Sequence, residues 1–113
     1  MAARNALSIA PPHAVELALS RLGADLRIAR LRRNLTIDEA AAKIGAGRRA
    51  VADAERGKAT TAVAVYVGLL WAYDLLGGVE NLADPTRDEE GLTLARAKER
   101  TRARRSEGLD NDF

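Results

Sequence analysis

The residues with the clearest chemical potential are Arg48 and Arg49, which follow a glycine-bearing turn, Gly45-Ala46-Gly47. An arginine can bind guanine O6 and N7 in bidentate fashion, and this discriminates against other bases by roughly 1–3 kcal/mol. A helix that begins at Arg48 would also offer its first N–H groups to a phosphate. The pair is a candidate for DNA contacts; an isolated Arg-Arg dipeptide, by contrast, is usually an ordinary surface feature.

Asp53 lies one helical turn after Arg49, close to the same face of the expected helix. Its carboxylate can accept from a cytosine amino group, or it can brace Arg49 at the i, i+4 spacing. We favour bracing. Glu55 is spaced to face inward beside Val51, and a buried carboxylate needs a partner. Arg30 is the candidate partner, unless both charges are exposed.

Two short helices must position these side chains. Thr36 to Glu39 fits a capping box, in which the Thr36 hydroxyl accepts from the backbone N–H of Glu39 and the Glu39 carboxylate reaches back. One helix is expected from Thr36 to about Lys43, and a second from about Arg48 to Arg56, where Gly57 ends it. This layout is typical of a helix-turn-helix DNA reader, whose second helix enters the major groove.

Further helices are expected on both sides of this pair. An apolar stripe runs through residues 12–33, formed by Val15, Leu19, Leu22, Leu26 and Ala29. Residues 62–75 are apolar over more than one stripe, so this helix is central to the core or shared with a second subunit. Its candidate core or dimer residues are Tyr66, Leu70, Trp71 and Tyr73. Residues 79–83 can form one more short helix.

Composition agrees with an all-α protein, because 23 of the 113 residues are alanine. The absence of cysteine excludes disulfides and thiolate metal sites, and because the single histidine has no cluster of further ligands we expect no metal site. We expect no cofactor and no catalytic constellation, so an enzyme is the least favoured class. The sequence has no apolar run of 18 residues, and we expect a cytoplasmic, nucleoid-associated protein without a membrane span.

Charge and proline positions suggest three segments. Residues 1–12 are expected to be disordered because Pro11-Pro12 interrupts a helix, residues 13–85 to form the DNA-binding domain, and residues 86–113 to form a C-terminal extension, partly helical or disordered. Residues 1–60 hold 11 Lys/Arg against 6 Asp/Glu, which suits a phosphate-binding surface but also an ordinary solvated one. The basic run 96–105 can add DNA affinity, or the tail can dock on a partner.

Residues 22–76 resemble the Xre family of lambda-repressor-like DNA-binding domains. The matching pattern is Leu-Gly-x-x-Leu-Arg, Leu-Thr-x-x-Glu, the glycine turn and a closing Glu-Arg-Gly. The resemblance implies a five-helix all-α fold with base contacts at Arg48, Arg49 and Asp53. It further implies phosphate contacts at Thr36, Lys58 and Thr60, and an internal ion pair between Arg30 and Glu55.

The later run LLWAYDLLGGVENLADPTRDEEGL is similar to HipB-like antitoxins of the same family. This similarity implies a homodimeric repressor that binds operator DNA, regulates its own operon and neutralises a HipA-like kinase toxin. A stand-alone, prophage-like regulator and a protein-interaction module that has lost DNA reading are the alternatives.

The chain departs from the family pattern at four positions. Ala40 and Ala54 stand where a larger aliphatic residue is usual, Gly47 replaces a serine or threonine cap, and Ile37 replaces a glutamine that often contacts phosphate. We therefore expect a looser core and a weakly capped helix from about Arg48 to Arg56.

Overall fold

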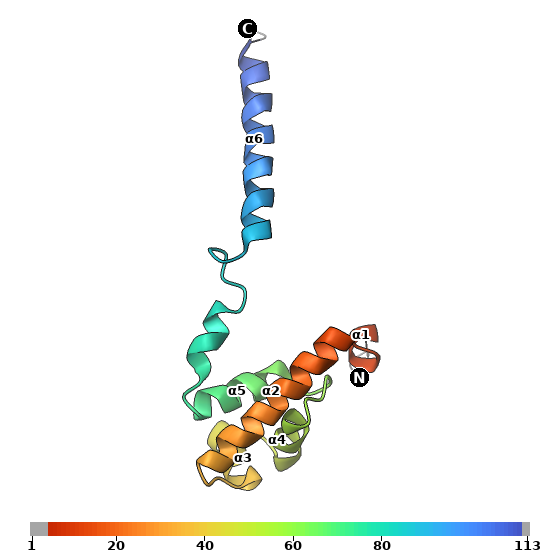
Figure 1. Ribbon diagram of the computed structural model, residues 1–113, viewed down its shortest axis with the longest axis vertical. Coiled ribbons are helices and arrows are strands. Elements are labelled where there is room, and N and C mark those ends of the chain that lie inside the picture. Colours follow the sequence, from red (N-terminus) through yellow and green to blue (C-terminus); the bar gives the residue numbers. More distant parts are fainter. Residues whose placement is uncertain (1–4, 112–113) are drawn as a thin grey trace. The chain divides into compact units, whose positions relative to one another are not determined.

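The computed structural model describes residues 5–111, with side chains through residue 106, and these residues contain helices and no strand (Figure 1). This is the expected all-α class. The helices are α1 (Ala6–Ile9), α2 (His13–Arg32), α3 (Ile37–Ile44), α4 (Arg48–Glu55), α5 (Val63–Ala72), the 3₁₀ helix η1 (Leu76–Asn81) and α6 (Glu89–Asn111). The chain divides into two units, residues 1–77 and residues 78–113. No helix among the described residues is long and apolar enough to cross a membrane.

The N-terminal segment differs from the expectation of disorder through residue 12. Asn5 caps α1, because its side-chain Oδ1 accepts from the backbone N–H of Ser8 at 2.9 Å. Pro11 and Pro12 follow α1, and Pro12 is the N-cap residue of α2. The prolines therefore separate two helices rather than preventing both, and residues 1–4 lie outside the described residues.

The core of residues 1–77 is built largely from small side chains on α2 to α5. Ala40, Val51, Ala54 and Leu69 are fully buried, and Tyr73 is the largest of the fully buried side chains. Ala40 on α3 and Ala54 on α4, the positions at which the sequence predicted a looser core, are themselves fully buried. Val15, at the start of the predicted stripe, is 38% exposed, so the stripe extends beyond the core.

Two glycines let α2 approach the C-terminal end of α4. A Cβ atom on Gly23 would lie 2.6 Å from the carbonyl oxygens of Ala54 and Glu55. Gly57 has a φ of +69°, and a Cβ atom there would collide with the backbone of Leu19. The glycines of the Leu-Gly and Glu-Arg-Gly patterns thus form one backbone contact that fixes α4 on α2.

Helices α2, α3, α4 and α5 all end in the same way. Each is followed by a residue of positive φ, which is Asn34, Gly45, Gly57 or Asp74. The next residue in each case donates its N–H to a carbonyl five residues earlier: Leu35 to Arg30, Ala46 to Ala41, Lys58 to Asp53 and Leu75 to Leu70. These are Schellman-type ends, which satisfy carbonyls that the helix leaves unpaired and turn the chain sharply.

The second unit is organised by short-range hydrogen bonds. Asp84 accepts from both the backbone N–H and the hydroxyl of Thr86, at 2.9 and 2.8 Å, and the backbone bond lowers the pKa of this carboxyl. Asp88 accepts from the N–H of Gly91 at 3.0 Å and caps α6. A short helix was predicted at 79–83, and the structure has the 3₁₀ helix η1 from Leu76 to Asn81, which begins three residues earlier and includes Gly77 and Gly78. The tail is helical to Asn111.

Candidate nucleic-acid interface

The start of α3 has the capping box that the sequence predicts. Thr36 Oγ1 accepts from the backbone N–H of Glu39, and the backbone N–H of Thr36 donates to Glu39 Oε1, both at 3.1 Å. The bond from the Thr36 backbone holds the pKa of Glu39 below its usual value. At the other end, Gly45 adopts the left-handed conformation with a φ of +67°, as expected for the turn.

The start of α4 has no such cap. Gly47 has extended backbone angles and no side-chain hydrogen bond satisfies the first turn, which contains no acidic residue. Arg48 and Arg49 are both exposed there. Arg48 Nε lies 3.5 Å from Asp38 Oδ1, and because both side chains are more than 70% exposed this pair is a weak restraint. The helix N-terminus and the two guanidinium groups together form a strongly positive surface.

Asp53 does not brace Arg49, so the interpretation that we favoured from the sequence is wrong. Its Oδ1 accepts from Arg56 Nη2 at 2.6 Å, and its Oδ2 lies 3.7 Å from Lys58 Nζ. The Arg56 bond is the main cause of the lowered pKa of Asp53, and the charges of Lys58 and Arg49 act in the same direction. The i, i+3 pair joins the last turn of α4 to Arg56, the residue that follows the helix. Asp53, with 14% of its side chain exposed, is therefore engaged with Arg56 and Lys58.

The loop after α4 carries the expected phosphate-contact residues Lys58 and Thr60, both exposed. Tyr66 on α5 holds this loop, because its hydroxyl donates to the carbonyl oxygen of Lys58 at 2.7 Å. The Tyr66 ring is buried, and burial raises the pKa of its hydroxyl. Tyr66 is therefore a core residue that also positions Lys58, a role that the sequence did not indicate.

Arg30 and Glu55 form the predicted ion pair between α2 and α4. Arg30 Nε donates to Glu55 Oε2 at 2.6 Å, and Arg30 Nη2 donates to Glu55 Oε1 at 3.0 Å. Arg30 Nη1 also donates to the carbonyl oxygen of Leu35 at 2.9 Å. The two side chains are only 8% and 6% exposed, and the bond to Glu55 raises the pKa of Arg30. This bidentate pair fixes the last turn of α4 to the end of α2.

The four residues that were predicted to lie in the core or in a dimer contact, on α5 and at its end, differ in burial. Tyr66 and Tyr73 belong to the core, Leu70 is partly buried against it, and Trp71 is 60% exposed. Trp71 is thus available for an intermolecular contact. The Tyr73 hydroxyl is buried and has no hydrogen-bond partner among the described residues.

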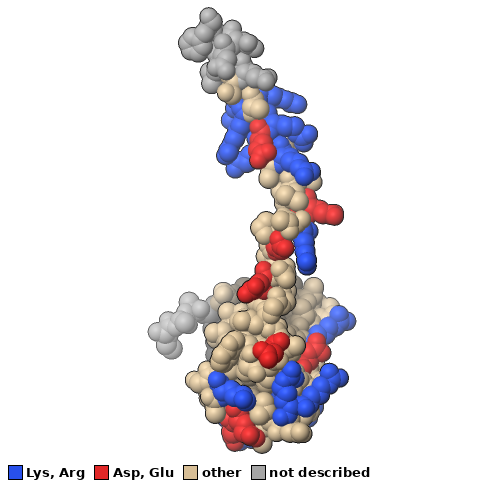
Figure 2. Space-filling view, turned by 90° about the vertical axis from the view of Figure 1, so that its left-hand side faces the viewer, with Lys and Arg blue, Asp and Glu red and all other residues tan. Residues whose placement is uncertain are grey.

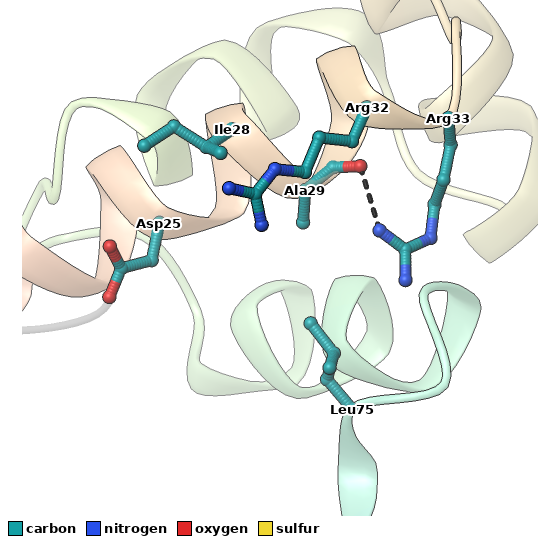
Figure 3. Close-up of a pocket in the computed structure, with 6 residues that line it drawn as sticks. All are labelled: Asp25, Ile28, Ala29, Arg32, Arg33 and Leu75. Atoms are coloured by element: carbon teal, nitrogen blue, oxygen red, sulfur yellow. Dashed lines mark hydrogen bonds between the residues drawn. The ribbon is translucent and has the colours of Figure 1, made fainter.

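Arg33 was not singled out from the sequence, yet it joins the ends of α2 and α5. Its Nη1 donates to the Ala29 carbonyl oxygen at 2.9 Å and its Nη2 to the Tyr73 carbonyl oxygen at 2.8 Å, and the guanidinium lies 5.4 Å from the centre of the Tyr73 ring. The first of these bonds borders a shallow pocket of about 340 Å³ between α2 and Leu75 (Figure 3). No local pattern could have revealed a contact between residues 40 positions apart.

Arg56 is the second side chain that sequence reasoning missed. It is exposed at the end of α4, and its bond to Asp53 holds it beside Lys58. The i, i+3 spacing of Asp53 and Arg56 was the available signal. Arg48, Arg49, Arg56 and Lys58 are therefore four exposed cations carried by α4 and the loop that follows it.

Comparisons of this chain with models of known protein families, with curated proteins and with solved structures found no match.

Proposed function

We propose that residues 13–77 are a DNA reader of the lambda-repressor-like type, in which α4 enters the major groove and Arg48 and Arg49 contact base edges. One observation carries this proposal: an exposed arginine pair stands at the uncapped start of a helix whose far end is fixed by the buried Arg30–Glu55 pair. Base readout requires donors on a rigid support, because a displacement of about 1 Å breaks a bidentate contact.

Phosphate contacts complete the proposed interface. Thr36 lies at the start of α3, and Lys58 and Thr60 lie in the loop after α4, so these residues flank the arginine pair along the chain. We assign a further contact with the DNA backbone to Arg56, because Asp53 holds it in place while its side chain is 70% exposed. Asp53 then acts by positioning Arg56 and Lys58, and not by reading a base.

In the cell, this reader would act as a homodimeric transcriptional repressor, since one recognition helix covers only a half-site. Exposed apolar side chains on and after α5 support self-association: Val63 is 74%, Trp71 60% and Leu75 46% exposed. The resemblance to HipB-like proteins favours an antitoxin that binds a kinase-type toxin and regulates its own operon. Co-purification with the product of the adjacent gene tests this last step, and a neighbour that is not a kinase would favour a stand-alone regulator.

The test of DNA reading begins with selection of bound duplexes from a random library by the full chain. Arg49→Ala is expected to reduce discrimination between the selected and scrambled duplexes by roughly 1–3 kcal/mol, the value of one bidentate contact. Lys58→Ala is expected to weaken binding to both duplexes equally and to reduce the salt slope by about 1. Arg27→Ala, at an exposed position of α2, is the matched control and should bind as the unaltered protein does.

Two results would overturn the proposal. The first is recovery of no preferred sequence from the library, which would favour a protein-interaction module instead. The second is binding of the selected duplex by Arg48→Ala and Arg49→Ala with unchanged affinity and preference.

A further inference from the structure

Helix α6 carries a second concentration of positive charge, in addition to that of α4 and the loop that follows it. Six Lys or Arg residues and one acidic residue, Glu99, lie between positions 96 and 105. All of these side chains are exposed, and none of the six basic ones forms an ion pair with a described side chain of residues 5–106. Figure 2 shows Lys and Arg side chains projecting from both sides of this helix.

The six cations fall into two rows because of their spacing. The first row is Arg96, Arg100 and Arg104, and the second is Lys98, Arg102 and Arg105. At 3.6 residues per turn the two rows lie roughly 170° apart around the helix. The helix therefore has two basic sides and not one basic face.

The two faces between the rows differ in chemistry. One face carries Ala97 and Thr101, which are small and uncharged, whereas Glu99 lies on the opposite face. A surface that approached the Ala97 side would meet both basic rows and no carboxylate. Within the basic run, the helix thus has two cationic flanks, a small neutral face between them and the Glu99 carboxylate on the opposite face.

The start of α6 is acidic, so the positive charge of this helix is limited to residues 96–105. Asp88 caps the helix, and Glu89 and Glu90 occupy its first turn. Acidic residues at the start of a helix complement its dipole, so this end stabilises the helix while repelling phosphate. The cationic part is a length of about 15 Å, at 1.5 Å per residue.

We propose that α6 is a second DNA-binding element, which lies in the major groove of duplex DNA with one basic row against the phosphates of each wall. The Ala97–Thr101 face then points to the groove floor, and Glu99 points away from the DNA. The B-DNA major groove is about 12 Å wide and admits an α-helix. The major groove of A-form RNA is deep and narrow, which makes duplex DNA the expected ligand.

Binding in the groove would also reduce the repulsion between like charges on the helix. The cations of the first row repeat at i, i+4, as do Lys98 and Arg102, and like charges at this spacing destabilise a helix. Phosphates on both flanks would neutralise them. Six phosphate contacts would contribute a slope of about 5 to the dependence of log affinity on log salt concentration.

The experiment uses the full chain and a 20-base-pair DNA duplex of scrambled sequence, so that base reading by α4 does not contribute. One variant replaces the first row (Arg96, Arg100 and Arg104→Gln) and a second replaces the other row (Lys98, Arg102 and Arg105→Gln). Each is expected to lower affinity at least tenfold and to reduce the salt slope by nearly 3. Glu99→Gln is the control and should leave affinity within twofold, because its side chain faces away from the DNA.

A further variant separates a groove-bound helix from a flexible basic tail. Thr101→Pro keeps every charge but breaks the helix within each row, after Arg100 in the first row and before Arg102 in the second. We expect it to lose affinity as the row variants do, and we expect duplex RNA of the same sequence to bind the unaltered protein at least tenfold more weakly. Retained affinity in Thr101→Pro, equal binding of RNA, or an effect of only one row would each overturn the proposal.

These outcomes are independent of the proposed function of α4. Loss of sequence preference in Arg49→Ala together with unchanged binding in the row variants would support DNA reading by α4 and remove α6 from the interface. The reverse result would retain α6 and remove the arginine pair.

Discussion

Residues 1–77 and helix α6 carry similar cations on very different supports. Around α4, fully buried alanines, a glycine contact and a bidentate ion pair fix the backbone, and the arginines project from it. In α6, every side chain from 92 to 106 is exposed, and helix rules alone set where each charge lies. The difference teaches that a few positioned arginines suit base readout, whereas many cations along one exposed helix suit contacts with the phosphate backbone.

The largest effect is expected when the Glu55 carboxylate, which fixes α4 to α2, is removed. Glu55→Ala leaves the Arg30 guanidinium, which is 8% exposed, without its ion-pair partner. Loss of one partner of a buried pair costs roughly 3–5 kcal/mol of unfolding free energy, measured by urea denaturation followed by circular dichroism. Glu99→Ala on α6 is the control and should change it by less than about 0.5 kcal/mol. A loss below about 1 kcal/mol in Glu55→Ala would show that packing alone positions α4.

The next largest loss of unfolding free energy is expected when the glycine contact between α2 and α4 is disturbed. Gly23→Ala would place a Cβ atom 2.6 Å from two carbonyl oxygens, so the helices must separate. Overpacking of this kind costs typically about 1–3 kcal/mol of unfolding free energy. Gly78→Ala, where no atom lies within 4 Å of the added Cβ, is expected to be nearly neutral in the same measurement. Equal stability of the two variants would contradict a close α2–α4 approach.

The two buried tyrosines allow a finer test of how the interface is held. Tyr66→Phe removes the hydrogen bond to the Lys58 carbonyl and is expected to cost about 0.5–1.5 kcal/mol of stability. Tyr73→Phe removes a hydroxyl that has no hydrogen-bond partner among the described residues, so its effect should be neutral or stabilising. Thermal denaturation of both variants measures the difference. The reverse order of stability would mean that the Lys58 loop is held in another way.

The smallest expected effect lies at the start of α4. Gly47→Ser supplies the missing side-chain cap at a position with extended backbone and open space, and should raise stability by a few tenths of a kcal/mol. Gly45→Ser also meets no neighbouring atom, but its φ of +67° makes the substitution destabilising by about 1 kcal/mol. Comparison of the two unfolding midpoints checks both values. A destabilised Gly47→Ser variant would show that the first backbone N–H groups of α4 are already satisfied in another way.

Local patterns predicted much of the fold because each depended on neighbours in the chain. The Thr36–Glu39 capping box, the left-handed Gly45 and the ends of the helices follow from residues within one or two turns. The Arg30–Glu55 pair was also anticipated, since two charges spaced to face inward can be buried only as partners. Asp53 was misassigned because three cations lie within its reach, and spacing alone cannot rank them.

The sequence by itself determined helices α2 to α5, the glycine residues that follow α3 and α4, and the places where arginines gather. It could do so because hydrogen-bonding spacing, glycine conformation and side-chain periodicity are properties of the local chain. The tertiary structure alone decided that Asp53 engages Arg56, that Tyr66 supports the Lys58 loop, and that Arg33 joins residues 40 positions apart. It also decided that Ala40 and Ala54 are fully buried. These outcomes depend on which helix faces come together, and that is fixed only when the whole core packs.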